Sequence, residues 1–277
     1  MSRRPRRNRP PRLDADPVAA FTHDPGVATP SEDARAKVPT LRRRVVEARI
    51  AGPHSHFGRD AVKASIRALV GGDRRARLGC DGLEGCSPDE VRDALASTHG
   101  WDPNAARAAI DPECTLAAIE AAGVRIAEAA QAGARIAVAT ARPASLLGLA
   151  QFVATEATAL GGRVLVSDRA AIDGTAGREL WWIGGVAVLT DGTALLASDG
   201  AGDDWLFAVG RPDLVVADRA YAGAALRAGC EVVAWADLDA PALSLAAARG
   251  RRVLVVPLDE RRPAAAYEVV EDALDLG

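Results

Sequence analysis

The protein has 277 residues, of which 49% are hydrophobic and only 4% aromatic, so small aliphatic side chains must form most of its core. A formal net charge of −3 and a pI near 5.9 argue against nucleic acid as a partner, because the chain as a whole does not attract a polyanion. No apolar run reaches the roughly 20 residues that a membrane span requires, which argues against a membrane partner as well.

Four cysteines occur in a chain without a recognisable signal peptide. This combination is typical of a reduced protein rather than of a disulfide scaffold. We therefore expect a soluble, cytoplasmic protein. The sequence carries no signature of an oligomeric state.

The first twelve residues, MSRRPRRNRPPR, contain six arginines and three prolines and no aromatic residue. Such a segment buries too little apolar surface to become ordered. Residues 1–39 are therefore predicted to be a disordered Arg/Pro-rich tail, and residues 40–277 a single domain. Within that domain we expect a helical part over 40–110 and a sheet part over 111–277.

Two helix starts are indicated by their capping residues. In SPDEVRDALA, Ser87 is the expected N-cap, Pro88 the first helical residue, and Glu90 is expected to reach back to the cap in a capping box. The segment DPECTLAAIEAAGVRIAEAAQAG repeats this start with an Asp-Pro pair at Asp111 and ends at Gly133.

Five short apolar segments in the rest of the chain are typical of buried parallel strands. Helical segments near 143–160, 219–229 and 240–249 separate most of them, which predicts helices on both faces of one sheet. The run ELWWIGGVAVLTDGTALLAS contains an Asp-Gly pair between two apolar runs, a hairpin signal that makes the sheet mixed. The predicted fold is a three-layer, Rossmann-like α/β domain with a mostly parallel sheet, whose strands lie at 134–139, 163–167, 213–217, 231–236 and 252–256.

Polar residues follow the first of these strands, in VATARPAS. Open parallel sheets bind ligands at the carboxyl ends of strands, where helix N-termini present unpaired N–H groups and the positive end of the helix dipole. Thr140, Arg142 and Ser145 surround such a helix start, and a hydroxyl group, a guanidinium and free N–H groups suit a phosphate or a carboxylate. The alternative is an ordinary turn with a solvent-facing arginine.

Aspartates follow three further strands. Asp218 precedes Arg219 in VVADRAYAGAAL, Asp237 and Asp239 lie in AWADLDAPAL, and the segment VSDRAAIDG carries two more. Carboxylates at adjacent strand ends offer the oxygen ligands that a divalent ion such as Mg²⁺ or Mn²⁺ prefers. The alternative for each aspartate is an N-cap or turn role. Because Arg142 and Arg219 both follow strands of one sheet, we expect them to face one pocket and to repel each other without a bound anion.

His54 and His56 form a His-x-His pair ahead of a helix predicted to begin near Asp60. Such a pair can bind a transition metal, but the only further histidine in the predicted domain is His99 and no cysteine has zinc-finger spacing. The favoured interpretation is a flexible surface loop or a polar contact to the sheet edge. The chain contains no G-x-G-x-x-G, P-loop or G-x-S-x-G motif, which argues against a dinucleotide enzyme, an NTPase and an α/β-hydrolase.

Five segments, in a fixed order and spacing, carry a likeness to known proteins: AIDPECTLAAI, GGVAVLTDGTALL, PDLVVADRAYAGAALRAG, ADLDAPAL and VLVVPLDE. On these segments the chain, over residues 40–275, resembles a group of actinobacterial phosphatases. The resemblance implies the fold of that group and a phosphorylated ligand. It carries Asp218 and Thr140 over to this chain as residues of the group's pattern.

The chain departs from that pattern where the group has histidines. Arg142 takes the place of the histidine in an expected Thr-Gly-His-Pro run. Arg219 takes the place of the histidine in an expected Asp-His-Gly run. The stretch at 198–201 replaces an expected His-Thr-His run. Arginine binds anions but does not shuttle protons at neutral pH, whereas imidazole does. These departures leave anion binding intact and put catalysis of the group's type in doubt.

The leading hypothesis is a phosphoric-monoester hydrolase that acts on, or binds, a small phosphorylated metabolite. Asp218 and Asp237 would be catalytic and, with Asp239, would hold a divalent metal. The phosphate would be bound by side chains at the strand ends, namely Thr140, Arg142, Ser145 and Arg219. Two alternatives stay open: a catalytically inactive relative that binds an anion as a sensor or scaffold, and a sugar-phosphate isomerase, which needs only a carboxylate base and phosphate anchors.

Overall fold

The computed structural model describes residues 40–54, 56–167, 177–198 and 200–276. Two predicted features lie outside the described residues: the tail over residues 1–39 and the aspartates that follow residue 167. The expectations for them stay predictions. None of the described helices is both long and apolar enough to cross a membrane. All four cysteines are free thiols, and Cys80, Cys86 and Cys230 are buried.

The segment expected to be helical contains α2 (Leu41–Glu47), α3 (Arg59–Val70) and α4 (Pro88–His99). It also contains a feature that the sequence did not indicate, a small antiparallel sheet of β1 (Gly52–Pro53) and β2 (Ala109–Ile110). The remaining α-helices of the described chain are α5 (Pro112–Gln131), α6 (Pro143–Ala159), α7 (Gly202–Val209), α8 (Arg219–Arg227), α9 (Pro241–Ala248) and α10 (Glu268–Leu274).

A mixed, mostly parallel sheet forms the centre of the domain. Its main path has the order β10-β9-β8-β3-β6-β5, in which only β5 is antiparallel to its neighbour. Two short strands lie off this path, β4 beside β3 and β7 beside β6. The strands are β3 (Arg135–Ala139), β4 (Arg163–Val164), β5 (Glu179–Ile183), β6 (Val186–Thr190), β7 (Leu195–Leu196), β8 (Leu214–Asp218), β9 (Glu231–Ala236) and β10 (Val253–Pro257).

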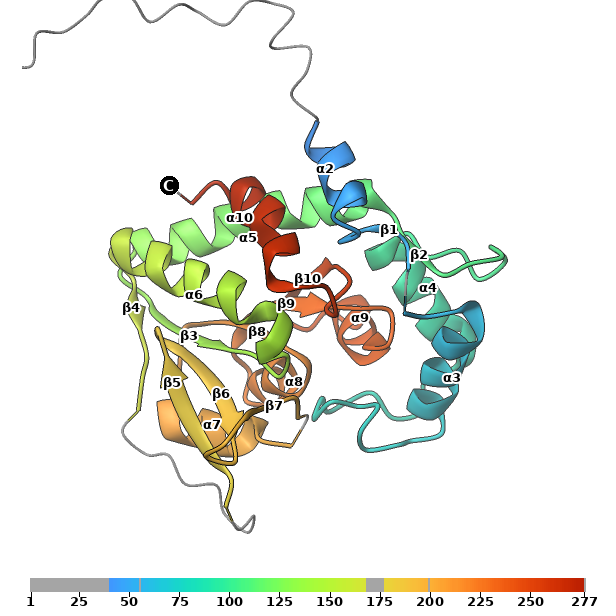
Figure 1. Cartoon of the computed structure of the whole chain (residues 1–277). Helices are drawn as coiled ribbons and strands as arrows, with labels where there is room; N and C mark the ends of the chain where they lie inside the picture. The colour runs from blue at the N-terminus through green and yellow to red at the C-terminus, as the bar shows by residue number, and fades with distance from the viewer. Residues whose placement is uncertain (1–39, 55, 168–176, 199, 277) are drawn as a thin grey trace, which may run out of the picture. The chain divides into compact units, whose positions relative to one another are not determined.

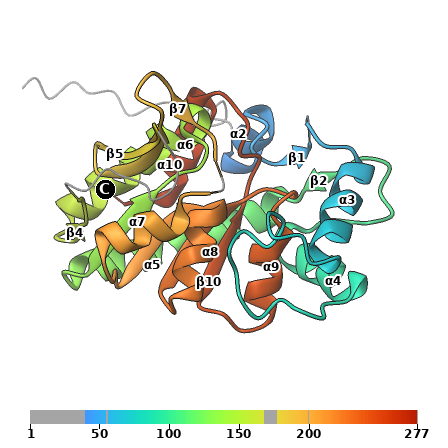
Figure 2. The same cartoon turned by 90° about the horizontal axis from the view of Figure 1, so that it is seen from below.

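Helices cover both faces of the sheet, which confirms the predicted three-layer α/β fold (Figures 1 and 2). Side chains alternate along the central strands: Val215 and Ala217 of β8 pack into the core on the side of α8 and α9. Leu214 and Val216 pack on the opposite side, with α5, α6 and α10. This alternation follows from the period of two residues in a strand, and a strand buried on both faces is therefore apolar throughout.

The connections that follow the parallel neighbours β3 and β8 leave toward opposite edges of the sheet. From β3 the chain runs through α6 toward β4 and β6, whereas from β8 it runs through α8 toward β9, on the other side. A crevice opens beyond the carboxyl ends of two adjacent strands whose connections leave in opposite directions, and ligands of open α/β sheets bind there. The fold therefore directs attention to the residues that follow Ala139 and Ala217.

Most of the capping and hairpin signals are confirmed. The Ser87 hydroxyl accepts a hydrogen bond from the Glu90 N–H at 3.1 Å, and Asp111 caps α5 in the same way. The hairpin at the Asp-Gly pair joins β6 to β7. The Glu90 carboxylate also reaches back to the Ser87 backbone, as the capping box predicts. It accepts two further hydrogen bonds from the Arg249 guanidinium, at 2.7 and 3.0 Å.

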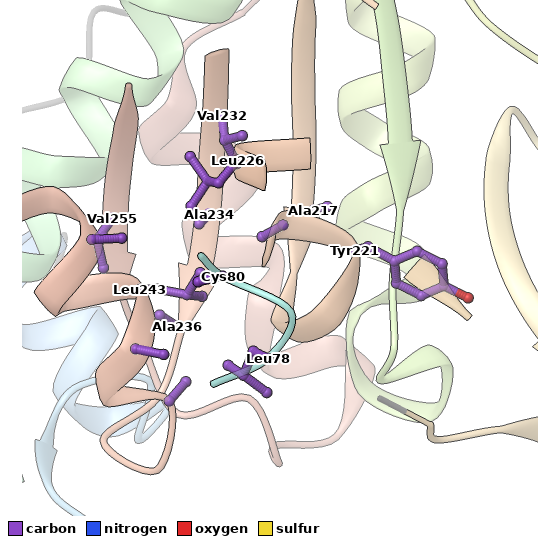
Figure 3. Packing of buried hydrophobic residues seen from close by; sticks show 14 of the residues in the cluster. Leu78, Cys80, Ala217, Tyr221, Leu226, Val232, Ala234, Ala236, Leu243 and Val255 are labelled. Atoms are coloured by element: carbon purple, nitrogen blue, oxygen red, sulfur yellow. The ribbon is translucent and has the colours of Figure 1, made fainter. Parts of the chain in front are cut away.

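Helix α8 lies in direct contact with a loop from the helical part of the chain. A Cβ atom at Gly223 would stand 1.8 Å from the Leu78 carbonyl oxygen and 3.3 Å from the Cys80 nitrogen, so only glycine allows this approach. Figure 3 shows Leu78 and Cys80 among the buried side chains of α8, β8 and β9. This contact ties the helical part to the helix that begins at Arg219.

The contact yields a prediction with an internal control. Gly223→Ala should lower the unfolding free energy by about 1–3 kcal/mol, because backbone atoms must move to accept the methyl group. Gly148→Ala in α6 should instead be neutral or stabilising by up to about 1 kcal/mol, since nothing lies within 4 Å of its added Cβ and alanine favours a helix. Thermal and urea unfolding followed by circular dichroism measure both, and equal stability of the two variants would contradict the proposed close approach.

Candidate functional site

The carboxyl ends of β3 and β8 are joined by a buried hydrogen-bonded pair. The sheet register places Ala139 beside Ala217, so the next residues, Thr140 and Asp218, lie level with each other. The Thr140 hydroxyl donates to Asp218 Oδ2, and the Ala141 N–H donates to Asp218 Oδ1, each at 2.6 Å. Asp218 precedes α8 but makes no side-chain cap to that helix. Its carboxylate instead fixes the turn that leads into α6.

Arg219 adopts a backbone conformation that is costly for any residue other than glycine. Its φ is +47°, in the left-handed region, and its side chain is only 8% exposed. The guanidinium donates to Asp239 Oδ1 at 2.9 Å and to Glu260 Oε2 at 3.3 Å. Because non-glycine residues in this conformation persist only where their surroundings hold them, these carboxylates help to fix the strained position.

Glu260 also attracts the second arginine of the site. Arg142 Nε lies 3.7 Å from Glu260 Oε2, so both Arg142 and Arg219 converge on one buried carboxylate. The expected repulsion between the two arginines is therefore relieved by the protein itself, without a bound anion. Glu260 is fully buried, and its Oε1 has no hydrogen-bond partner among the described residues.

A third arginine closes the outer side of this network. Arg261 donates to Asp239 Oδ2 at 2.7 Å, and its guanidinium carbon lies 4.4 Å from the centroid of the Phe57 ring. Asp239 thus bridges Arg219 and Arg261. The arrangement leaves Arg261 partly exposed at the edge of the site, with 38% of its side chain accessible.

A second cluster of charged groups lies at the ends of β9 and β10. His54 Nε2 is 2.8 Å from Asp237 Oδ1 and 3.7 Å from Asp259 Oδ2, and all three side chains are almost completely buried. Potential ligand atoms of these residues lie within 4.8 Å of one another, so the cluster is able to hold a metal ion. Asp237 Oδ2 has no hydrogen-bond partner among the described residues. A buried carboxylate oxygen without a donor is costly, and a cation would satisfy it.

The hydrogen bonds around His54 determine which ring nitrogen carries the proton. Nδ1 accepts the backbone N–H groups of His56 at 3.1 Å and Phe57 at 3.0 Å, so Nδ1 is unprotonated. Nε2 therefore carries the hydrogen and donates it to Asp237. Metal binding through Nε2 would require the proton to move to Nδ1 and both backbone contacts to break. The two carboxylates therefore fit a cation better than His54 does.

Burial controls the acidity of these groups. Burial raises the pKa of Asp237, an effect that the hydrogen bond from His54 opposes. It also raises the pKa of Asp218 and Glu260, although Arg219 opposes both shifts. For His54, burial lowers the pKa, but the hydrogen bond to Asp237 and the nearby carboxylate charges raise it above its ordinary value overall.

An open cavity adjoins the arginine network at the start of α6. It has a volume of about 310 Å³ and is lined by the first turn of α6, by β7 and the residue after it, and by Arg261. The lining residues are Arg142, Pro143, Ala144, Ser145, Leu195, Ala197 and Arg261. Two guanidinium groups and a helix N-terminus thus face one space with an apolar wall.

The structure therefore divides the residues singled out from the sequence. Arg142 and Ser145 line the cavity, whereas Thr140 and Asp218 are buried behind it with their side chains paired to each other. Of the three aspartates expected to bind a metal, only Asp237 belongs to the cluster with ligand spacing found among the described residues. His56, the second member of the His-x-His pair, is exposed and outside that cluster.

Three residues of the site were missed in the sequence: Asp259, Glu260 and Arg261. They directly follow β10, and the rule that ligands gather at the carboxyl ends of parallel strands would have selected them had it been applied to the last strand.

The pKa of His99 is shifted in the opposite direction from that of His54. His99 is completely buried beside the Ala236 carbonyl oxygen, and burial lowers its pKa to about 4, so it remains neutral inside the core.

The paired arginine gives a prediction about stability. Arg219→Ala should destabilise the protein by about 3–5 kcal/mol, because it leaves the buried Glu260 carboxylate without its main counter-charge. Adding Glu260→Gln removes that charge, so the double variant should be more stable than Arg219→Ala alone. Urea unfolding of the wild type, both single variants and the double variant measures the coupling. Strictly additive effects would show that the pair does not interact.

Comparison with known proteins shows which family this chain is similar to. A family model described as Phosphatase matches residues 36–274 of the chain. The protein named Phosphatase SCO2771, from Streptomyces coelicolor, is 32% identical over 233 residues, which cover 79% of this chain and 87% of that relative. The residues matched by the family model include every described strand and helix and all residues of the site discussed above. The chain therefore belongs to the Phosphatase family.

Proposed function

We propose that the protein is a phosphoric-monoester hydrolase that acts on a small phosphorylated metabolite at the carboxyl ends of the parallel strands. One observation carries the proposal: a cavity lined by Arg142 and Arg261 lies beside an arginine-linked group of buried carboxylates, one of which, Glu260, has an oxygen without a hydrogen-bond partner. Cationic groups that bind a phosphoryl group next to carboxylates that hold a cation are what phosphoryl transfer requires.

The phosphoryl group of the substrate would lie at the start of α6. Arg142 and Arg261 supply positive charge, and the positive end of the α6 helix dipole adds to it. The Ser145 hydroxyl adds a donor. The rest of the substrate would contact Leu195 and Ala197, and the volume of about 310 Å³ suits a small molecule rather than a polymer.

A divalent cation would be held by Asp237 and Asp259. Mg²⁺ is typically bound by one or two carboxylates, with the remaining ligands supplied by water and substrate phosphate, so the two side chains are sufficient. When bound, such an ion neutralises charge on the phosphoryl oxygens and lowers the pKa of a bound water molecule. The hydrogen bond from His54 orients Asp237 for this role.

Thr140, Asp218 and Arg219 would position the reacting groups rather than contact them. The Asp218 carboxylate fixes the Thr140–Ala141 turn and hence the start of α6. Arg219 holds Asp239 and Glu260 in place. Because both nitrogens of His54 are engaged, Glu260 Oε1 is the candidate acceptor for the proton of the attacking water.

A second function is favoured by a specific observation: arginines stand where β3 and β8 lead into α6 and α8. Arg142 and Arg219 bind anions but do not carry protons, and His54 is held by three hydrogen bonds. A protein with these features would bind a phosphorylated molecule without hydrolysing it and act as a sensor. Turnover distinguishes the two functions.

The metal assignment predicts a pattern of activity. Phosphate release from a panel of phosphorylated metabolites should require Mg²⁺ or Mn²⁺ and stop with EDTA. Asp237→Asn and Asp259→Asn should each lower kcat by at least about 10²-fold, because each removes a negative ligand. Asp60→Asn, which removes an exposed carboxylate from the first turn of α3, should leave activity unchanged. Phosphate binding without turnover under all metal conditions would select the sensor instead.

The phosphate site can be tested without turnover. Inorganic phosphate should raise the melting temperature of the wild type, by an amount equivalent to about 1.4 kcal/mol at ten times its dissociation constant. Arg142→Ala should abolish most of this shift, whereas Arg107→Ala, which removes an exposed arginine outside the cavity, should retain it. An unchanged shift in Arg142→Ala would place phosphate elsewhere on the protein.

A further inference from the structure

A second and larger cavity lies away from the strand ends. It has a volume of about 540 Å³ and is bounded by α3, α4 and the loop after α4, which lie together at the end of the domain opposite β5 in both views (Figures 1 and 2). Its lining consists of Lys63, Ile66, Arg67, Pro88, Arg92, Pro103 and Asn104. It shares no lining residue with the cavity at α6. The two spaces are therefore separate sites.

The charge on this cavity is entirely positive. Lys63 and Arg67 lie one turn apart on α3, and Arg92 faces them from α4, while no carboxylate lines the space. Arg92 is paired with Asp89, but neither Lys63 nor Arg67 lies within ion-pair distance of a carboxylate of the described chain. Two like charges one helical turn apart repel each other by a few tenths of a kcal/mol, and an anion between them removes that cost.

The remaining lining residues define the rest of the ligand. Ile66, Pro88 and Pro103 form apolar walls, and Asn104 offers both an amide donor and a carbonyl acceptor. The volume lies within the range of small-molecule sites, and such sites combine apolar walls with a few polar groups. Lys63 is also the only lysine among the described residues. Apart from histidine, every other basic side chain described is an arginine.

We propose that this cavity is a second binding site, for a small organic anion that carries at least two negative charges and an apolar part. Lys63 and Arg67 bind the charged groups, and the isoleucine and proline side chains contact the apolar part. The site is independent of the phosphatase function proposed above, because it uses none of the same residues. The charged groups of this ligand are phosphates or carboxylates, and the experiment distinguishes the two.

The protein offers a direct readout, because it contains only two lysines, Lys37 and Lys63. Acetylation of the full chain by a lysine-selective reagent, followed by mass spectrometry of its peptides, gives the modification rate at each. Inorganic pyrophosphate or citrate, at ten times its dissociation constant and at constant ionic strength, should slow acetylation of Lys63 about tenfold and leave Lys37 unchanged. Acetate, with one charge, should protect Lys63 far less.

Two variants make the test specific. Arg67→Ala should abolish the protection of Lys63, whereas Arg59→Ala, which removes a cation from the same helix outside the cavity, should retain it. Protection by pyrophosphate alone or by citrate alone supports the site and identifies the charged group as phosphate or carboxylate. The proposal is overturned if neither anion protects Lys63, if Lys37 is protected equally, or if Arg67→Ala is protected as well as the wild type.

Discussion

The balance of buried charge at the carboxyl edge of the sheet is the constraint on which the site depends. Five carboxylates gather there, and four of them are fully or almost fully buried: Asp218, Asp237, Asp259 and Glu260, with Asp239 beside them. Taking a carboxylate out of water is costly unless it is paired and hydrogen-bonded. Each therefore has a nearby group that offsets its charge: the hydroxyl and N–H of the β3 turn, Arg219, Arg261 or His54.

This balance explains why Arg219 tolerates its unusual backbone. A left-handed conformation costs an L-residue roughly 1–2 kcal/mol, which is less than the cost of leaving a buried carboxylate unpaired. The same comparison of charges and hydrogen bonds shows which carboxylate oxygens have no partner among the described residues. Asp237 Oδ2 and Glu260 Oε1 lack partners among the described residues, and these are the positions at which a cation, a proton or a substrate group would complete the balance. The charge network thus links the stability of this edge to its proposed chemistry.

The two buried histidines show how surroundings determine the role of one side chain. His99 lies against a backbone carbonyl group, and no carboxylate among the described residues pairs with it, so burial dominates and keeps it neutral. His54 is also buried, but two aspartates surround its Nε2 and raise its pKa. Arginine at the positions of Arg142 and Arg219 removes this variability, because a guanidinium stays charged in either environment. The charge at these two positions is therefore determined by the residue type rather than by its surroundings.

The sequence by itself determined the layers of this protein and the general position of its site. Apolar runs, capping residues and the Asp-Gly pair act over a few residues, so the strands, the helix starts at Ser87 and Asp111 and the hairpin could be predicted from local pattern. The rule for parallel strands then selected Thr140, Arg142 and Asp218. Only the tertiary structure decided which side chains meet. His54 and Asp237 are 183 residues apart, and Arg219 and Glu260 are 41 apart. Their contacts depend on strand order and register, which are set by packing of the whole sheet and leave no local pattern.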